Sequence, residues 1–276
     1  MEPKPQTRIR PDHGLARIDL REFWDYRELL YILVWRDIKV RYKQTALGAA
    51  WAVLQPLVAM LVFTLILGKL AHVPSDGLPY PVFAYSGLLL WQFFSRALTE
   101  ASMSLVVNER VITKVYFPRL LVPSSVVLAG LMDFAIAFVL LLALMAGYGL
   151  RISWNVLLAP VFVLLAMAAA LGVSFWLSAL DVKYRDVRYT LPFLTQIWLF
   201  ATPVVYPSSL VPEWLRPWYG LNPMVGVVEG FRWSLLGGAT APNIMMIGIS
   251  TAVVGLVLVG GILYFRAMEQ TLADLI

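Results

Sequence analysis

The chain has 276 residues, of which 60% are hydrophobic and only 14% are charged, and its formal net charge is +5. Soluble domains contain about 45–50% apolar and about 25% charged residues. A water-soluble fold with this composition would expose large apolar patches, and such patches aggregate or bind membranes. The composition therefore excludes an ordinary soluble domain and predicts an all-α integral membrane protein.

The rare residue types exclude several kinds of site. The chain has no cysteine, so it cannot form disulfides, thiolate metal sites or a cysteine nucleophile. The two histidines, His13 and His72, are far apart in the sequence, and we expect no metal site and assign neither a function. The first 20 residues are polar and lack the apolar core of a secretory signal peptide. We therefore expect the chain to insert through its own helices.

Residues 1–48 are predicted to form a polar cytoplasmic tail and then, over residues 22–48, an amphipathic helix in the membrane interface. Trp24 and Trp35 suit the depth of the lipid headgroups, and Arg36 and Arg41 belong to a basic run that would face anionic lipids. The apolar residues that recur at helical spacing are Phe23, Tyr26, Leu30, Leu33 and Val34. Two interpretations stay open: the helix is a simple anchor, or it is a lever that contacts a cytoplasmic partner.

Residues 49–276 are predicted to form one transmembrane domain with six spanning helices. Each span needs about 20 mostly apolar residues. The predicted spans cover residues 49–70, 80–106, 121–146, 154–180, 190–206 and 243–265.

The basic residues are distributed unequally over the segments that these spans separate. With six spans, 17 lysines and arginines lie on one side and 4 on the other. Because segments rich in Lys and Arg stay in the cytoplasm, we predict that both termini are cytoplasmic.

Three ionisable residues lie within the second and third predicted spans. Arg96 and Glu100 are four residues apart, hence on one helix face, and are predicted to pair. Asp133 lies deep in the third span, where an ionisable group should face protein or water. An isolated acid makes a poor proton relay, so we favour a structural hydrogen bond from Asp133 to a neighbouring helix.

The longest predicted extracytoplasmic segment is 207–242. It contains five prolines yet is rich in Trp, Leu, Val and Phe. It is too broken to span the membrane and too apolar to be a free loop. The segment therefore predicts short re-entrant helices between spans five and six that cap or line a cavity.

Aromatic and amide residues within or at the ends of the spans are candidates for lining a channel. Aromatic rings have an apolar face that can stack on sugars, and a channel with few charges would suit a neutral or weakly charged glycan better than an ion. The candidates are Trp51, Gln55, Phe63, Trp91, Gln196, Trp198, Phe200 and Tyr206.

The sequence contains no phosphate-binding loop, dinucleotide fingerprint or nucleophile signature. We therefore expect no enzymatic activity, metal or cofactor in this chain. If ATP drives transport, a separate subunit must bind the ATP and its Mg²⁺.

Four stretches in order resemble the permeases of polysaccharide-export ABC transporters, which serve O-antigen, capsule and teichoic-acid export. They are RDIKVRYKQTALGAAWAVLQP (36–56), NERVITKVYFPRLLVP (108–123), YRDVRYTLPFLTQIWLFATPVVYP (184–207) and LNPMVGVVEGFR (221–232). With the spans between them, these stretches cover nearly the whole chain beyond about residue 20.

The resemblance implies a transmembrane subunit of the bacterial inner membrane that exports a lipid-linked polysaccharide, with O-antigen as the favoured cargo. In this family two permeases work with two ATPase subunits, and the channel lies between the permeases. By resemblance, the first and fifth spans line that channel and 207–242 forms gate helices. The segment 108–118 resembles the family's coupling helix, which docks on the ATPase. The coupling candidates are Asn108, Glu109, Arg110, Lys114, Tyr116, Phe117 and Pro118.

The expected partners are thus an ATPase in two copies, a second copy of this chain, the polysaccharide and membrane lipids, without nucleic acid. One alternative is an ABC exporter of small hydrophobic molecules or drugs. Two further classes fit the sequence less well. A membrane enzyme would need clustered acids or histidines, and a proton-coupled transporter would need internal repeats and several intramembrane acids. We see neither pattern in the sequence. The sequence leaves open the polysaccharide, its lipid carrier and any export signal.

Overall fold

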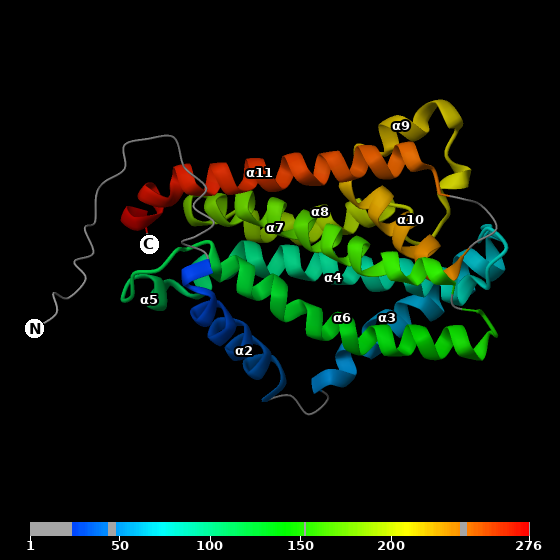
Figure 1. Ribbon diagram of the computed structural model, residues 1–276, viewed down its shortest axis with the longest axis horizontal. Helices are drawn as coiled ribbons and strands as arrows, with labels where there is room; N and C mark the ends of the chain where they lie inside the picture. Colours follow the sequence, from blue (N-terminus) through cyan, green and yellow to red (C-terminus); the bar gives the residue numbers. More distant parts are fainter. Residues whose placement is uncertain (1–23, 44–47, 152, 238–241, 276) are drawn as a thin grey trace, which may run out of the picture.

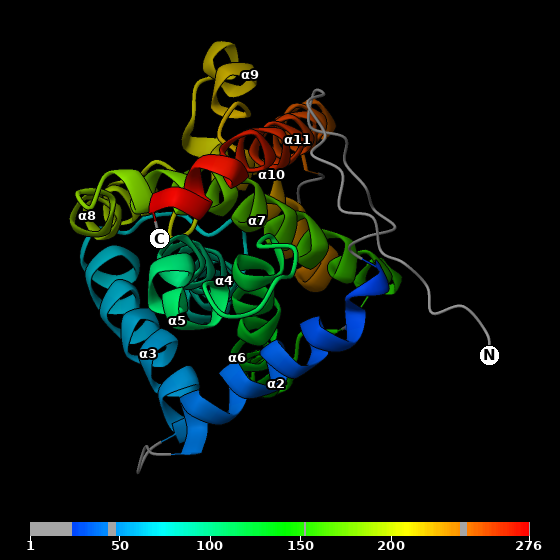
Figure 2. The ribbon, with the colours of Figure 1, turned by 90° about the vertical axis from the view of Figure 1, so that its left-hand side faces the viewer.

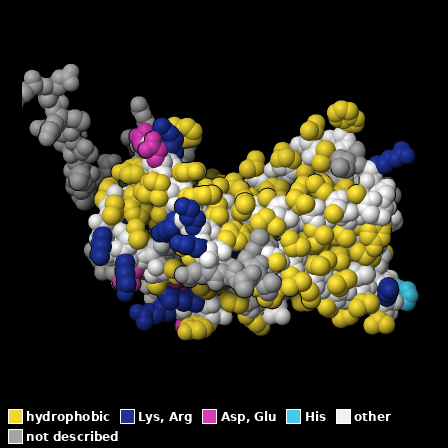
Figure 3. Space-filling model, turned by 90° about the horizontal axis from the view of Figure 1, so that it is seen from below, with side chains coloured by type: hydrophobic (Ala, Val, Ile, Leu, Met, Phe, Trp, Pro, Cys, Tyr) yellow, Lys and Arg dark blue, Asp and Glu magenta, His cyan; other side chains and the backbone are white. Residues whose placement is uncertain are grey.

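The computed structural model describes residues 24–43, 48–151, 153–237 and 242–275, which form helices joined by turns, with no strand among them. The long helices lie roughly along one axis (Figure 1). Two short helices mark its ends: α5 (Glu109–Ile112) and α9 (Arg216–Tyr219). We call these the α5 end and the α9 end. Seen in Figure 3, Lys and Arg gather toward the α5 end, and hydrophobic side chains cover the middle of the molecule.

Helix α2 (Arg27–Lys43) is present where the interface helix was predicted. It lies obliquely beside α6, near the α5 end (Figure 2). Leu33 is buried, and Leu30 packs beside it, whereas Trp24 and Trp35 are exposed. One predicted apolar position, Phe23, lies outside the described residues.

Among the described residues, four segments are long and apolar enough to cross a membrane, by length and composition. The first combines α3 (Gly48–Phe63) with the π-helix η1 (Thr64–Leu70), and the second is α6 (Leu121–Gly147). The third combines the 3₁₀ turn η2 (Trp154–Leu158) with α7 (Ala159–Lys183), and the fourth is in α11 (Ile244–Leu275). These segments match the first, third, fourth and sixth predicted spans.

The second and fifth predicted spans correspond to α4 (Tyr80–Val107) and α8 (Val187–Phe200). Helix α4 has 28 residues but is less apolar. This lower hydropathy is tolerated because α4 lies in the middle of the bundle, where other helices rather than lipid surround it. It contacts α3, α6, α7, α8 and α10 (Figure 2). Helix α8 has 14 residues, or about 21 Å, which is less than the roughly 30 Å of a bilayer core. The six predicted spans therefore correspond to four that meet these criteria, a central helix and a short one.

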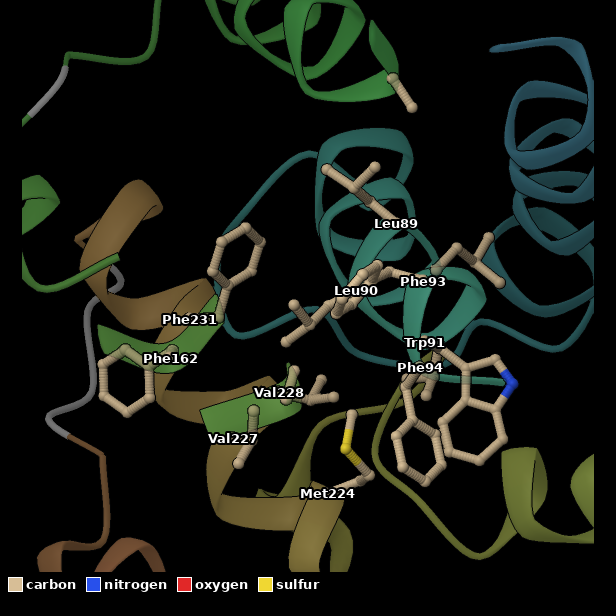
Figure 4. Packing of buried hydrophobic residues seen from close by; sticks show 14 of the residues in the cluster. Leu89, Leu90, Trp91, Phe93, Phe94, Phe162, Met224, Val227, Val228 and Phe231 are labelled. Carbon is tan, nitrogen blue, oxygen red and sulfur yellow. The ribbon is translucent and has the colours of Figure 1, made fainter. Parts of the chain in front are cut away.

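The main core is built around α4. Figure 4 shows Phe93 and Phe94 of α4 among buried side chains from α7 and α10, such as Phe162 and Phe231. Helices α7 and α11 pack very closely at Gly172. A Cβ atom at this position would lie only 2.8 Å from the Leu258 backbone, so the approach requires glycine. Small residues allow this kind of close approach between membrane helices.

The described residues of the segment 207–242 contain short helices, as predicted, and their re-entrant placement in a membrane stays a prediction. After the single turns η3 (Ser208–Leu210) and η4 (Glu213–Leu215), α9 stands out from the α9 end and α10 (Pro223–Leu236) packs into the core (Figure 1). The Asn222 side chain caps α10 by accepting a hydrogen bond from the Met224 amide. Gly237 ends the helix with a φ of +55°, which favours glycine. Twelve residues of α10 are buried, so this helix belongs to the core rather than to a free loop.

Candidate functional site

A polar cavity of about 320 Å³ opens between α3, α4, α6 and α8. We call it the inner cavity. Its apolar wall includes Pro56, Phe93, Phe134 and Pro192. Its polar groups are Gln55, Gln92, Ser95, Arg96, Thr99, Glu100, Asp133 and Thr195. Helix α4 supplies most of these polar groups, which explains its lower hydropathy.

Charged residues from three helices meet at this cavity. Asp133 of α6 accepts a hydrogen bond from Arg96 Nη1 of α4 at 3.1 Å, and it also accepts hydrogen bonds from Arg41 and Tyr42 of α2. Glu100 forms an ion pair with Arg96, whose Nε lies 3.7 Å away, and accepts a hydrogen bond from Arg41. We call these five residues the inner network. It contains two arginines and two carboxylates, so its charges balance.

The ion pairs explain how Asp133 is tolerated inside the helical domain. Its side chain is only 12% exposed, and an unpaired carboxylate in such a place would lose much of its hydration without compensation. The two arginines replace that hydration, and they thereby attach α2 to α4 and α6. The predicted pairing of Arg96 with Glu100 and the predicted hydrogen bond of Asp133 are both confirmed.

Tyr42 donates its hydroxyl proton to Asp133. Burial, and then the hydrogen bond to Asp133, raise the pKa of the Tyr42 hydroxyl. The hydroxyl therefore stays protonated at neutral pH and remains a donor to the carboxylate.

Sequence reasoning assigned Arg41 to the lipid-facing basic run and did not single out Tyr42. A signal was present in the charges of the predicted spans. Away from the span ends, the spans contain two acids, Glu100 and Asp133, but only one basic residue, Arg96. A second cation was needed to balance Glu100 and Asp133. The sequence could not tell which residue of the basic run 36–43 would supply it.

The sequence pattern of the ABC-2 type transporter family matches residues 28–236, which include the whole inner network. The chain belongs to this family. An O-antigen export system permease of Myxococcus xanthus is 36% identical over 216 residues, covering 77% of this chain and 82% of that protein. A Klebsiella pneumoniae O-antigen export system permease is 25% identical over 90% of this chain and 95% of the relative. A polysialic acid transport protein of Escherichia coli is 23% identical over 86% of this chain and 92% of the relative. The chain is thus a permease of the ABC-2 type.

The predicted channel-lining residues of this ABC-2 permease occupy different surroundings. Gln55 lines the inner cavity and lies 3.4 Å from Arg96. Trp51 and Phe200 are exposed on α3 and α8. Gln196 is also exposed, and Phe63 is partly buried at the end of α3. Of these five candidates, Gln55 alone lines the inner cavity.

Three other candidates are held within the permease. Trp91 is only 4% exposed and packs against Phe94, with the ring centroids 5.4 Å apart (Figure 4). The centroid of the Trp198 ring lies 6.2 Å from that of Trp91. Its assignment to the channel lining was wrong, because the ring belongs to the α4 core. Trp198 is partly buried and donates a hydrogen bond to Asn222. The Tyr206 hydroxyl forms a hydrogen bond with the Tyr219 hydroxyl at 2.8 Å. Trp198 and Tyr206 therefore both stabilise the α9 end.

The segment 108–118 lies at the α5 end between α4 and α6 (Figure 1). Helical structure covers only Glu109–Ile112 within this segment, and a turn and irregular backbone follow it. The expectation of a helix therefore holds for the first part alone. Asn108 stays close to the permease because its side-chain amide donates a hydrogen bond to the Ser104 carbonyl. Arg110 and Lys114 are exposed.

The two aromatic residues of this segment differ. Tyr116 is 80% exposed, whereas Phe117 is 5% exposed and packs in a buried cluster with Leu105 and Phe265. Pro118 is buried as well. The expectation that Phe117 supplies an apolar surface knob was wrong, since the side chain anchors the segment to α4 and α11.

The predicted interface residues also differ in their contacts. Arg36 pairs with Asp37 at 2.7 Å, and the other Asp37 oxygen accepts a hydrogen bond from Ser125 of α6. Arg41 belongs to the inner network and donates hydrogen bonds to Asp133 and Glu100. The basic run of α2 is thus partly engaged inside the protein rather than wholly turned toward lipid.

Proposed function

We propose that this permease is the transmembrane subunit of an ATP-driven exporter that moves a lipid-linked polysaccharide of the O-antigen type across the bacterial inner membrane. The single observation that carries this proposal is the 36% identity with the Myxococcus xanthus O-antigen permease over 82% of that protein's length. The further relatives named for O-antigen and polysialic acid support the same class of cargo.

In this proposal the α5 end is cytoplasmic and six helices cross the membrane. Helix α4 crosses within the bundle. Helix α8 completes its crossing through the turn that follows it, where residues 202–205 are buried. Both termini are then cytoplasmic, in agreement with the excess of basic residues at the α5 end.

Two copies of the permease face one another across α3 and α8. Trp51, Phe193 and Phe200 are exposed on these helices, and a second copy would cover them while enclosing the inner cavities. A sugar chain without such a conduit would leave its hydroxyl groups unpaired in hydrocarbon, at several kcal/mol each. Because the charges of the inner network are already paired, they would bind a passing neutral glycan only weakly, as conduction requires.

The energy comes from two copies of an ATPase subunit, which bind ATP and Mg²⁺. The segment 108–118 is the proposed docking site, with Arg110, Lys114 and Tyr116 offering charge and an apolar ring to the ATPase. Phe117 supports the segment from inside. Closure of the ATPase pair would then push on α4 and α6, which this segment connects.

A gene deletion in the bacterium that encodes the chain tests the cargo. Loss of long-chain surface polysaccharide, with lipid-linked polymer accumulating inside the cell, is the expected result. Unchanged surface polysaccharide would overturn the proposal. If the deletion instead sensitised the cells to hydrophobic drugs, the small-molecule exporter would take its place.

The docking site can be tested with one pair of variants. Tyr116→Ala removes an exposed ring at the α5 end and should reduce co-purification of the ATPase and ATP-driven export. Tyr148→Ala removes an exposed ring at the opposite end and should change neither. Normal coupling of Tyr116→Ala would argue against docking at this segment.

A further inference from the structure

A second polar pocket, of about 280 Å³, lies at the α9 end, beyond the inner cavity. We call it the outer pocket. It is formed by the residues before α4, the segment after α8, and α10. The residues important here are Asp76, Ser208, Arg216, Glu229, Arg232 and Trp233.

Arg232 forms a fixed positive charge in the wall of this pocket. It is 7% exposed, and its Nη2 atom donates hydrogen bonds to the carbonyls of Pro203 and Val204 at 3.0 and 2.8 Å. Its guanidinium lies 3.7 Å from the Phe83 ring centroid. A Cβ atom on Gly87 would come within 2.6 Å of Nη2, so glycine at this position leaves room for the arginine.

The charge of Arg232 is not neutralised by contact with an acid. No carboxylate of the described residues lies within the 4.0 Å of an ion pair, and its buried Nε atom has no hydrogen-bond partner there. Two backbone carbonyls and a ring compensate such a charge only in part. A wall with an incompletely compensated, buried donor group is suited to a polar ligand.

Two carboxylates face the same pocket with free accepting capacity. Glu229 Oε1 accepts the Ser208 amide at 3.2 Å, and Asp76 Oδ1 accepts the Ser209 hydroxyl at 2.9 Å. Among the described residues, the second oxygen of the Asp76 carboxylate accepts no hydrogen bond, and Ser208 is the one residue that donates to Glu229. A carboxylate can accept about four, so both retain sites for hydroxyl donors.

The balance of groups favours an uncharged ligand rich in hydroxyl groups. Asp76 and Glu229 would repel an anion, and Arg216 and Arg232 would repel a cation. A sugar residue offers hydroxyls that donate to the carboxylates and accept from arginine, and an apolar face for the Trp233 ring. The pocket volume is just below the roughly 300–1,000 Å³ of drug-sized ligand sites, which fits one such residue.

We propose that the outer pocket is a binding subsite for a single sugar residue of the polysaccharide, placed where the chain leaves the permease. This inference rests on the proposed function and adds to it a second, outer contact with the cargo. Each sugar held in the pocket would oppose backward slipping of the polymer between cycles of the ATPase.

Binding to the purified complex of permease and ATPase in lipid nanodiscs tests the inference. The probe is fluorescently labelled polysaccharide released by mild acid hydrolysis from the envelope of the encoding bacterium. Glu229→Gln and Asp76→Asn remove one carboxylate each. Asparagine tolerates the φ of +49° at position 76. Loss of one charge-assisted hydrogen bond should weaken binding about tenfold for either variant.

Glu28→Gln is the control, because this exposed carboxylate lies on α2, near the α5 end and outside the pocket. It should bind the probe like the unmodified permease. If Glu229→Gln does not assemble, Asp76→Asn carries the test alone. Equal binding by all folded variants, or no binding by the unmodified complex, would overturn the subsite. The proposed function would fail separately, through unchanged surface polysaccharide after gene deletion.

Discussion

The inner network and the outer pocket both bring arginines near carboxylates, but the arginines have different hydrogen-bond partners in the two places. In the inner network, Arg41 and Arg96 contact Glu100 and Asp133 directly. In the outer pocket, Arg232 contacts backbone carbonyls and a ring, and the nearby acids keep free accepting capacity. The first arrangement is complete and attaches helices to one another. The second leaves hydrogen-bonding capacity that a ligand can use.

Breaking the inner network should have the largest effect on stability. Asp133→Ala removes the acceptor shared by Arg41, Tyr42 and Arg96 and leaves Glu100 to balance two cations. Removing one partner of a buried pair costs about 3–5 kcal/mol. The lower end applies, since Arg96 is partly exposed. The free energy of unfolding in mixed detergent micelles measures this loss.

The same titration of Glu213→Gln serves as its control. This residue pairs with Arg216 at 3.7 Å on the exposed surface, where an ion pair is worth about 0–1 kcal/mol. If the two variants lost equal stability, the inner network would not hold α2 to the bundle.

Removing Arg232 should have a smaller effect than removing Asp133. Arg232→Met leaves the Pro203 and Val204 carbonyls without donors, at about 1–3 kcal/mol for an unsatisfied buried group. It also removes a buried cation that no carboxylate contacts, which offsets part of this loss. We expect a net loss of about 1–2 kcal/mol in the same unfolding titration. A loss greater than that of Asp133→Ala would reverse the comparison.

The smallest effect concerns the pH dependence of stability through Glu229. Burial raises the pKa of this carboxyl, while the hydrogen bond from Ser208 and the charge of Arg232 act in the opposite direction. The folded chain therefore holds the proton more tightly than the unfolded chain. This contribution to stability is fully present below the unfolded pKa and is lost as the pH rises through the folded pKa.

Unfolding titrations of the unmodified chain and Glu229→Gln, made at a series of pH values from 4.5 upward, test this dependence. The unmodified chain should lose stability relative to the variant as the pH rises. Parallel curves for the two proteins would mean that burial does not perturb Glu229.

Much of the helical layout could be predicted because its physical signals are local. A run such as 121–146 is apolar for long enough to span a bilayer, and the helix Leu121–Gly147 follows it closely. The prolines of 207–242 interrupt any long helix, and short helices occur there. The site was predicted less well. The spacing of Arg96 and Glu100 placed both on one helix face, but Trp91 on the same helix was wrongly assigned to a channel.

By itself, the sequence determined that the chain is an apolar, helical membrane protein with basic segments at one end and a charged residue pair in its second predicted span. These properties follow from composition, helix period and local spacing. Only the tertiary structure decided that Arg41 supplies the missing cation, that Phe117 points inward, and that Asp76, Glu229 and Arg232 share a pocket. Each of these outcomes depends on packing between helices distant in the sequence, and no local pattern specifies which faces of such helices will meet.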